Sequence, residues 1–218
     1  VITGGAGADV IDGAGGADAI SAGLGDDTVS YWGSEASIDG GGGANTLILK
    51  ASGGVTAVNF AVAPGVDQTT GDAVAVGNFQ NLDASALTSG LNVTGSFTAN
   101  IVTTGSGADV IDGGGGADVI NAGAGADTVS YWGSEVSIDG GAGVNTLVLQ
   151  AAATVNLGSA DQTSGDAALV SSFQNVNASA LSTGVTITGS ASANTIVGGS
   201  GADTIDGAGG ADVIAAGG

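Results

Sequence analysis

Aspartate recurs at nine-residue intervals in this sequence, within glycine-rich segments that carry an aliphatic residue two positions after the aspartate. In the clearest unit, Gly4–Asp12, Asp9 follows a run of glycine and alanine, and Ile11 follows Asp9 by two positions. A glycine-rich turn of this kind can aim backbone carbonyls and one carboxylate at a single point, and Ca²⁺ prefers ligand sets made only of oxygen. The aspartates in register, which we predict to bind several calcium ions, are Asp9, Asp18, Asp27, Asp109, Asp118, Asp127, Asp203 and Asp212.

The repeated unit has the form G-G-x-G-x-D-x-U-x, where U is a large aliphatic residue, and it resembles the calcium-binding repeat of the RTX (repeats in toxin) family. The units in phase are Gly4–Asp12, Gly13–Ser21, Ala22–Ser30, Thr104–Asp112, Gly113–Asn121, Ala122–Ser130, Gly198–Asp206 and Gly207–Ala215. The resemblance implies an all-β fold, a right-handed parallel β-roll (a β-solenoid) with about 18 residues per coil. It also implies export by type I secretion, and a secreted, extracellular or cell-surface location in a Gram-negative bacterium.

The eighth position of each unit is predicted to form the core. In a three-residue strand the middle side chain points opposite to its two neighbours. Position eight should therefore face inward, and positions seven and nine outward. The position-eight residues are Ile11, Ile20, Val29, Ile38, Leu47, Ile111, Ile120, Val129, Ile138, Leu147, Ile196, Ile205 and Ile214.

Stacked carboxylates indicate why a cation is needed. With two units per coil, Asp9 stacks on Asp27 and Asp27 on Asn45, and Asp109, Asp127 and Asn145 form a matching column. The chain has 21 acidic residues and one basic residue, with a net charge of −20. Without cations such a glycine-rich acidic chain would be expected to be disordered, so we predict that folding requires calcium. The absence of Cys and His excludes typical zinc, copper and iron sites.

Weaker candidate ligands lie at related positions. Glu35 and Glu135 fall one place early in their turns and are candidates to replace a missing carboxylate opposite Asp18 and Asp118. Four asparagines are either weak neutral ligands or members of an asparagine ladder: Asn45, Asn100, Asn145 and Asn194.

Acidic residues outside position six have simpler interpretations. The position-nine acids Asp12, Asp112 and Asp206 are expected to be solvated outward charges. The acids predicted to occupy a protruding loop without metal are Asp67, Asp72, Asp161 and Asp166.

An aromatic pair replaces the first glycines of one turn in each long repeat. The pairs are Tyr31-Trp32 and Tyr131-Trp132, each followed by Gly-Ser-Glu. Two interpretations stay open. The pair covers the coil edge and fills the space of an ion, or it is exposed and contacts sugar or a neighbouring molecule, because Trp and Tyr are favoured at interfaces.

A longer period of about one hundred residues overlies the short one, because Val110–Gly141 nearly repeats Val10–Gly41. The long repeats span approximately 1–100, 101–194 and, in part, 195–218. We predict a single elongated β-roll over residues 1–218, continuous through degenerate coils, as a window of a longer chain.

The composition argues against catalysis. There is no His, Cys or Arg, and Lys50 is the only basic side chain, so we predict no catalytic residue and no enzyme activity. The acidic surface disfavours nucleic acid and anionic lipid, and no segment predicts membrane insertion.

We therefore expect an extracellular calcium-binding structural repeat protein, a calcium-rigidified rod of a bacterial adhesin, surface layer or filament. The alternatives are a calcium-dependent secretion or stabilising module of a secreted RTX enzyme, and a sugar- or ice-binding module. The expected partners are neighbouring copies of the chain, and cell-surface polysaccharide is a second candidate.

Overall fold

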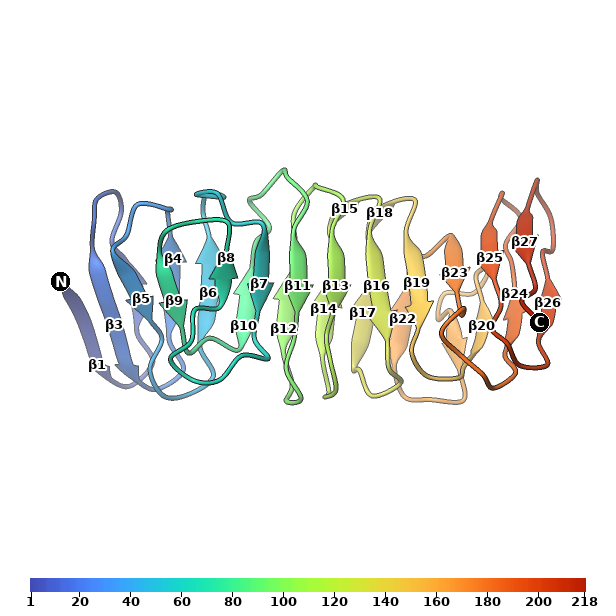
Figure 1. The fold of residues 1–218 in the computed structure, drawn as a ribbon, viewed down its shortest axis with the longest axis horizontal. Helices are drawn as coiled ribbons and strands as arrows, with labels where there is room; N and C mark the ends of the chain where they lie inside the picture. Colours follow the sequence, from blue (N-terminus) through green and yellow to red (C-terminus); the bar gives the residue numbers. More distant parts are fainter.

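Glycine-rich turns separate short strands along the whole chain, and the strands stack side by side into a long roll (Figure 1). The computed structural model describes all residues 1–218 and contains 27 strands and no helix. The structure therefore contains no helix that could span a membrane. Most strands are three residues long, which gives each one inward side chain between two outward ones.

One face of the roll is formed by two sheets. The four-stranded sheet has the order β1 (Ile2–Ala6), β3 (Ala19–Leu24), β5 (Ser37–Asp39), β9 (Ala75–Gly77). The nine-stranded sheet has the order β27 (Val213–Ala215), β25 (Thr195–Val197), β23 (Asn175–Asn177), β19 (Thr146–Leu149), β16 (Thr128–Tyr131), β13 (Val110–Asp112), β11 (Asn92–Thr94), β7 (Ala57–Asn59), β8 (Thr69–Thr70).

The opposite face also has two sheets. The eight-stranded sheet has the order β2 (Val10–Asp12), β4 (Thr28–Tyr31), β6 (Thr46–Leu49), β10 (Asn81–Asp83), β12 (Ile101–Thr103), β14 (Val119–Asn121), β17 (Ser137–Asp139), β22 (Leu169–Ser171). The other four-stranded sheet has the order β21 (Thr163–Ser164), β20 (Thr154–Asn156), β24 (Thr186–Thr188), β26 (Thr204–Asp206). A two-stranded pair, β15 (Ala124–Gly125) and β18 (Ala142–Gly143), lies at one edge.

The strand register confirms the predicted parallel β-roll. Within the repeat blocks Ile11 pairs with Val29 and Ile120 with Ile138, each one coil of 18 residues apart. All pairings are parallel except those of β7 with β8 and of β20 with β21. Outside the segments β7–β9 and β20–β22, successive strands of the two main faces alternate, as a coil of two units requires.

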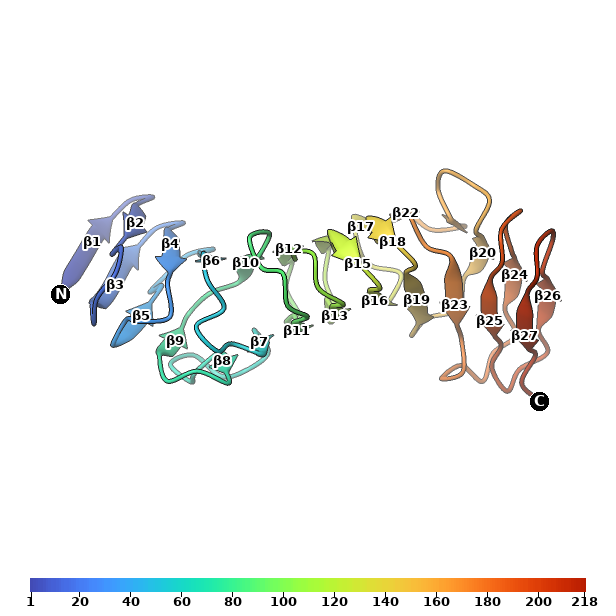
Figure 2. The same cartoon turned by 90° about the horizontal axis from the view of Figure 1, so that it is seen from above.

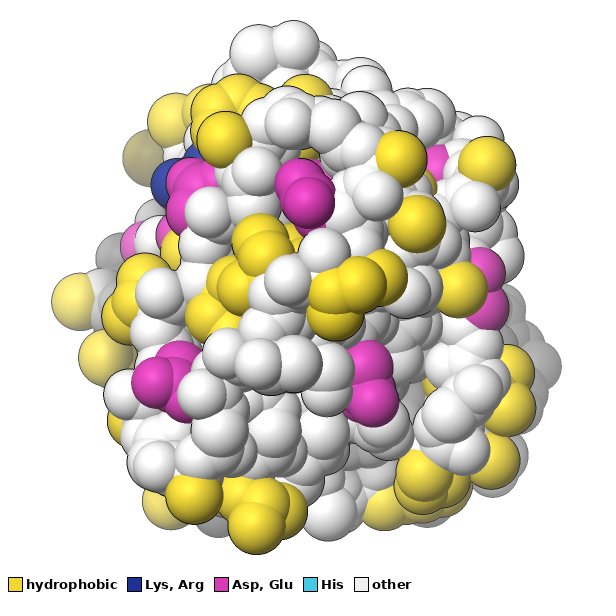
Figure 3. Space-filling view, turned by 90° about the vertical axis from the view of Figure 1, so that its left-hand side faces the viewer, with side chains coloured by type: hydrophobic (Ala, Val, Ile, Leu, Met, Phe, Trp, Pro, Cys, Tyr) yellow, Lys and Arg dark blue, Asp and Glu magenta, His cyan; other side chains and the backbone are white.

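The core is a ladder of the predicted position-eight residues. Ile20, Val29 and Leu47 in the first repeat are at most 2% exposed, as are Ile120 and Val129 in the second. Ile205 is only partly buried, and Ile214 is exposed because β27 has a neighbouring strand on one side only. At the N-terminal end, apolar side chains lie near the middle of the roll with acidic side chains around them (Figure 3).

Each long repeat contains an antiparallel excursion from the roll. In the first repeat β7 pairs with β8, and in the second β20 pairs with β21. Buried glutamines close these excursions: the Gln68 side chain donates to the Phe79 carbonyl and accepts from the Phe79 N–H, both at 2.8 Å, and Gln162 does the same with Phe173. The degenerate coils remain part of the stack, since β10 pairs with both β6 and β12.

Equivalent segments of the two long repeats lie on opposite faces. The Thr-Val-Ser-Tyr strand is β4 in the eight-stranded sheet and β16 in the nine-stranded sheet. In Figure 2 the β7–β8 excursion accordingly projects below the roll, and the segment beside β20 projects above it. The cause is that one long repeat contains an odd number of strand–turn units along the stack.

Candidate calcium sites

Each aspartate at position six folds back over its own turn toward the neighbouring coil. In the first repeat the backbone N–H of Asp9 donates to Asp27 Oδ1 at 2.9 Å. In the second, the N–H of Asp109 donates to Asp127 Oδ1 at 2.8 Å, and Asp109 Oδ1 accepts from the N–H of Leu91 at 2.8 Å. The predicted columns are therefore present, and one carboxylate oxygen each of Asp27, Asp109 and Asp127 accepts a hydrogen bond from the neighbouring coil, which holds the coils in register.

The second oxygen of these carboxylates has no protein partner. The Oδ2 atoms that are buried and accept no hydrogen bond belong to Asp9, Asp27, Asp109, Asp118 and Asp127. A buried carboxylate oxygen without a partner is costly, and stacked carboxylates ~4.8 Å apart also repel one another by about 3 kcal/mol at the effective dielectric near a protein surface. A bound cation would remove both costs.

The protonation equilibria of three predicted ligands reflect the same environment. Burial raises the pKa of the Asp109, Asp118 and Asp127 carboxyls above the ordinary value. Hydrogen bonds from the backbone oppose this effect, and the charge of Glu135 adds to it at Asp118. The ionised form is therefore disfavoured in the protein alone and would be favoured by a divalent ion.

In the turns of Asp9 and Asp118, the first glycine leaves open the space that the unpartnered carboxylate oxygen faces. A Cβ placed on Gly4 would lie 2.5 Å from Asp9 Oδ2 and 2.3 Å from the Ala22 carbonyl oxygen of the next coil. A Cβ on Gly113 would meet Asp118 Oδ2 at 2.7 Å. These two spaces are lined by carboxylate oxygens, joined in the first by a carbonyl oxygen, and a Cβ on either glycine would enter them.

The donor set fits calcium. No group of three or more acidic side chains converges in the structure, so further protein ligands beside a pair of carboxylates must be carbonyl oxygens. Glycine carbonyls stack along the same edges: a Cβ on Gly25 would lie 2.5 Å from the Gly7 oxygen, and one on Gly143 close to the Gly125 oxygen. Carbonyls mixed with carboxylates suit a hard cation with six or more oxygen ligands.

Three predicted ligands lie in half-buried turns. Asp212 Oδ1 accepts from the N–H of Asn194, and Asp203 Oδ1 from that of Val185, each at 3.0 Å. Asp203 Oδ2 also accepts from the N–H of Gly199 at 2.9 Å. Asp18 lies over Gly13, whose missing Cβ would be 3.3 Å from Asp18 Oδ2. Their role as ligands stays a prediction that the geometry permits.

Of the two interpretations of the asparagines, the structure supports the ladder. Asn45 Oδ1 accepts from the N–H of Asp27 at 2.9 Å, and Asn45 Nδ2 donates to the Asn78 carbonyl at 3.0 Å. Asn100 Oδ1 accepts from the Ser96 N–H, and its amide nitrogen also donates to a backbone carbonyl. Both ends of each amide are used within the protein, as they also are in Asn145 and Asn194.

The glutamates cap their own turns. Glu35 is buried, and its carboxylate accepts from the N–H groups of Trp32, Gly33 and Ser34 at 2.8–3.0 Å. Glu135 accepts from the two equivalent N–H groups of its turn at 2.7 and 2.9 Å. We expected these glutamates to replace a missing metal ligand. Their capping of the backbone was not predicted, because the nonapeptide spacing carries no signal for hydrogen bonds from backbone N–H groups to a side chain.

The aromatic pairs divide between core and surface. Tyr31 and Tyr131 are at most 1% exposed, so the interpretation of the tyrosines as exposed contacts is wrong. The Tyr31 hydroxyl donates to Asp72 Oδ2 at 2.8 Å. Trp32 and Trp132 are 41% and 43% exposed, and remain available for contacts.

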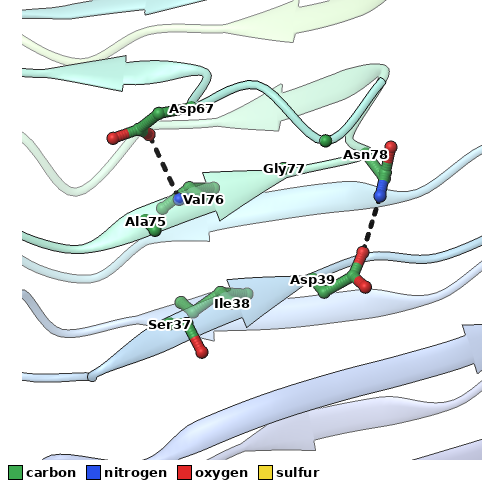
Figure 4. A pocket seen from close by; sticks show the side chains of 9 residues that line it. Ser37, Ile38, Asp39, Asp67, Ala75, Val76, Gly77 and Asn78 are labelled. Atoms are coloured by element: carbon green, nitrogen blue, oxygen red, sulfur yellow. Dashed lines mark hydrogen bonds between the residues drawn. The ribbon is translucent and has the colours of Figure 1, made fainter.

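Two groups of acids have partners that the sequence did not indicate. Asp12, expected to be a free outward charge, accepts from Trp32 Nε1 at 2.8 Å. In the excursion, Asp67 Oδ1 accepts from the N–H groups of Thr69 and Val76, both at 3.1 Å. Figure 4 shows Asp67 beside a shallow hollow over β5 and β9, where Asn78 Nδ2 donates to Asp39 Oδ1 at 2.7 Å. These acids serve local structure.

Comparison with known proteins agrees with the geometry. The family model of the RTX calcium-binding nonapeptide repeat (4 copies) matches residues 1–29, 94–129 and 186–218. No curated protein matches the chain. The three matched stretches contain all eight aspartates at position six. RTX repeats bind several Ca²⁺ ions and are typical of secreted bacterial proteins. Residues 1–29, 94–129 and 186–218 are therefore hemolysin-type RTX calcium-binding repeats, within a chain that folds as a parallel β-roll.

Proposed function

We propose that this chain is a calcium-rigidified rod in an extracellular structure of a Gram-negative bacterium, such as an adhesin, a surface layer or a filament. The observation that carries the proposal is the continuity of the stack. One sheet passes without interruption from β2 to β22, and another from β7 to β27, through both long repeats. Calcium between the acidic columns would make such a stack stiff, because it cross-links successive coils.

The residues support a structural role without catalysis. The chain has no His, Cys or Arg, and its acids are accounted for by the calcium columns and by local caps. The serine hydroxyls that donate to carboxylates, such as Ser85 to Asp83, have no His to act as their base. The proposal therefore assigns the acidic residues to folding and rigidity.

The exposed tryptophans support lateral contacts with neighbouring copies or with cell-surface polysaccharide. Trp32 follows β4 and Trp132 follows β16, so the two indoles lie at opposite edges of the roll. A rod with one aromatic platform on each side can contact partners on both sides. Large exposed aromatic residues are favoured at interfaces.

A calcium-dependent secretion or stabilising module of a secreted RTX enzyme is the second candidate, because the same fold would serve it. A catalytic domain in the same polypeptide would favour this alternative. The repetition of the whole 100-residue unit, including the aromatic turn, favours the rod.

Small-angle X-ray scattering tests the shape. One face carries a nine-stranded and a four-stranded sheet, so ~4.8 Å per strand predicts a rod about 58 Å long. We expect that maximum dimension for the monomer in millimolar calcium. An unfolded chain of 218 residues would have a radius of gyration of about 50 Å and a maximum dimension well above that of the rod.

Electron microscopy and light scattering in calcium test the association. We expect filaments or sheets, and weaker assembly in the double variant Trp32→Ala, Trp132→Ala. A wild-type chain that stays monomeric at high concentration in millimolar calcium would contradict self-association and leave polysaccharide binding to be measured directly.

A further inference from the structure

The amide of Asn145 lies in a cage of carbonyl oxygens. Its Nδ2 donates to Gly140 O at 2.7 Å and approaches Gly141 O at 3.3 Å, both in its own turn. It also donates to Ser172 O, from the next coil, at 3.0 Å. Three carbonyl oxygens surround this one electropositive group. A cation could occupy the same position.

Asn145 otherwise behaves like the aspartates below it in the column. Its Oδ1 accepts from the N–H of Asp127 at 3.0 Å, as Asp127 Oδ1 accepts from the N–H of Asp109 at 2.8 Å. The two side chains differ in their second terminal atom, which is Oδ2 in Asp127 and Nδ2 in Asn145. Asp127 Oδ2 is buried without a partner, whereas Asn145 has an N–H₂ group there that supplies its own donors.

Asparagine occupies the equivalent position at three other column ends. Asn45 Nδ2 donates to Asn78 O, at 3.0 Å. Asn100 Nδ2 donates to Gln80 O and Asn194 Nδ2 to Gln174 O, both at 2.6 Å. Beyond the asparagines the ladder continues through neutral side chains, since the N–H of Asn45 donates to Gln80 Oε1 at 2.8 Å.

We infer that Asn45, Asn100, Asn145 and Asn194 terminate the calcium columns, with the side-chain amide in place of an ion, and that the coils they enclose are held without calcium. All five orphaned carboxylate oxygens lie outside residues 45–100 and 145–194. Within those two spans the buried side-chain polar atoms have partners, such as Gln68 on Phe79 and Gln162 on Phe173. The chain thus alternates calcium-dependent blocks with neutral spacers.

Replacing Asn145 by aspartate should create an additional calcium site. In the variant Asn145→Asp, a carboxylate oxygen would face the carbonyls of Gly140 and Ser172 with no donor between them. That arrangement is repulsive in the absence of a cation and is a ligand set for calcium in its presence. The variant should therefore bind one calcium ion more than the wild type, and should lose more stability in chelator.

The matched control is Asn121→Asp. It makes the same change of charge at an exposed position, where the side chain only accepts from the N–H of Gly123 at 3.0 Å. Native mass spectrometry and equilibrium dialysis with Ca²⁺ alone as the probe count the bound ions. We expect one additional ion in Asn145→Asp and none in Asn121→Asp. Asn45→Asp repeats the test in the first long repeat.

Two results would overturn the inference. One is an unchanged number of bound ions in both Asn145→Asp and Asn45→Asp. Failure of both variants to fold in saturating calcium would also contradict the inference. The other comes from hydrogen exchange of the wild-type chain. Strands β10 and β20 of the spacers should stay more protected in chelator than β13 and β14, and equal loss of protection would contradict neutral spacers.

Discussion

Trp132 Nε1 donates to Asp112 Oδ1 at 2.8 Å, across 20 residues, and the same bond joins Trp32 to Asp12 in the first long repeat. The bond attaches the aromatic turn to the strand end of the preceding coil. Since the adjacent glutamate also binds the N–H groups of that turn, each indole is held in a fixed orientation at the surface. Both copies therefore present a preorganised aromatic face.

The Trp32–Asp12 bond should make stability depend on pH. The hydrogen bond from Trp32, followed by that from the Ala14 N–H, holds the pKa of Asp12 below its ordinary value. A lowered folded-state pKa stabilises the protein above the unfolded pKa of about 3.9, and this contribution disappears as pH falls through the folded-state pKa. We expect Trp32→Phe to raise the Asp12 pKa, measured by NMR titration. Trp132→Phe, the control, should leave it unchanged.

Calcium removal should unfold the repeat blocks. The stacked carboxylates of Asp9 with Asp27, and of Asp109 with Asp127, repel without an ion, and ion binding to several folded-state sites adds stability at each. Circular dichroism should show weakened β signal in chelator and recovery in calcium at about 10⁻⁴–10⁻³ M, the range of extracellular modules. An unchanged spectrum in chelator would contradict a structural role for the ion.

Asp127→Asn should weaken calcium binding far more than Asp112→Asn. Asp127 is buried within a column, and the amide keeps the hydrogen bond from the Asp109 N–H while removing the charge. Asp112 points outward and binds Trp132. We expect a loss of tenfold or more for Asp127→Asn, about 1.4 kcal/mol, by calorimetric titration. Equal effects would show that the register of ligands is wrong.

Gly113→Ala should block a site that Gly115→Ala leaves open. A Cβ on Gly113 would lie 2.7 Å from Asp118 Oδ2, the orphaned oxygen, whereas the closest atom to a Cβ on Gly115 is 3.6 Å away. Both glycines belong to one turn, and neither has a positive φ. The ion count of Gly113→Ala should therefore fall while that of Gly115→Ala is retained, and parallel behaviour of the two variants would argue against a site at Asp118.

Tyr31→Phe should destabilise the first excursion. Burial and then Asp72 raise the pKa of Tyr31, so its hydroxyl remains a donor to Asp72 at ordinary pH. Loss of a buried hydrogen bond to a charged group should cost about 1.5 kcal/mol, measured by urea denaturation in calcium. In a double-mutant cycle with Asp72→Asn, the combined cost should be smaller than the sum, and strict additivity would exclude the bond as a source of stability.

The sequence predicted the roll and the columns because both follow from short-range periodicity. Ile20 and Val29 lie inside since position eight alternates with outward neighbours, and Asp9 lies beside Asp27 since two units make one coil. No long-range information is needed for either. The eight aspartates of the prediction accordingly lie in the turns expected for them.

The partners of Tyr31 and Asn145 could not be predicted in the same way. The Tyr31 hydroxyl meets Asp72, 41 residues away, only because the excursion folds back onto the roll. The carbonyl of Ser172 reaches Asn145 across 27 residues of degenerate sequence that carries no nonapeptide spacing. Where the repeat is interrupted, contacts depend on loop paths, which periodicity does not define.

The placement of β4 and β16 on opposite faces gives the rod a symmetry that neither repeat has alone. Advancing by one long repeat also turns the molecule by half a revolution, so the chain approximates a two-fold screw axis along its length. Surface features of one repeat are therefore copied onto the other side in the next, as the excursions at β8 and β21 are. A polymer with this symmetry has two equivalent sides and remains straight on average, although each of its units is asymmetric.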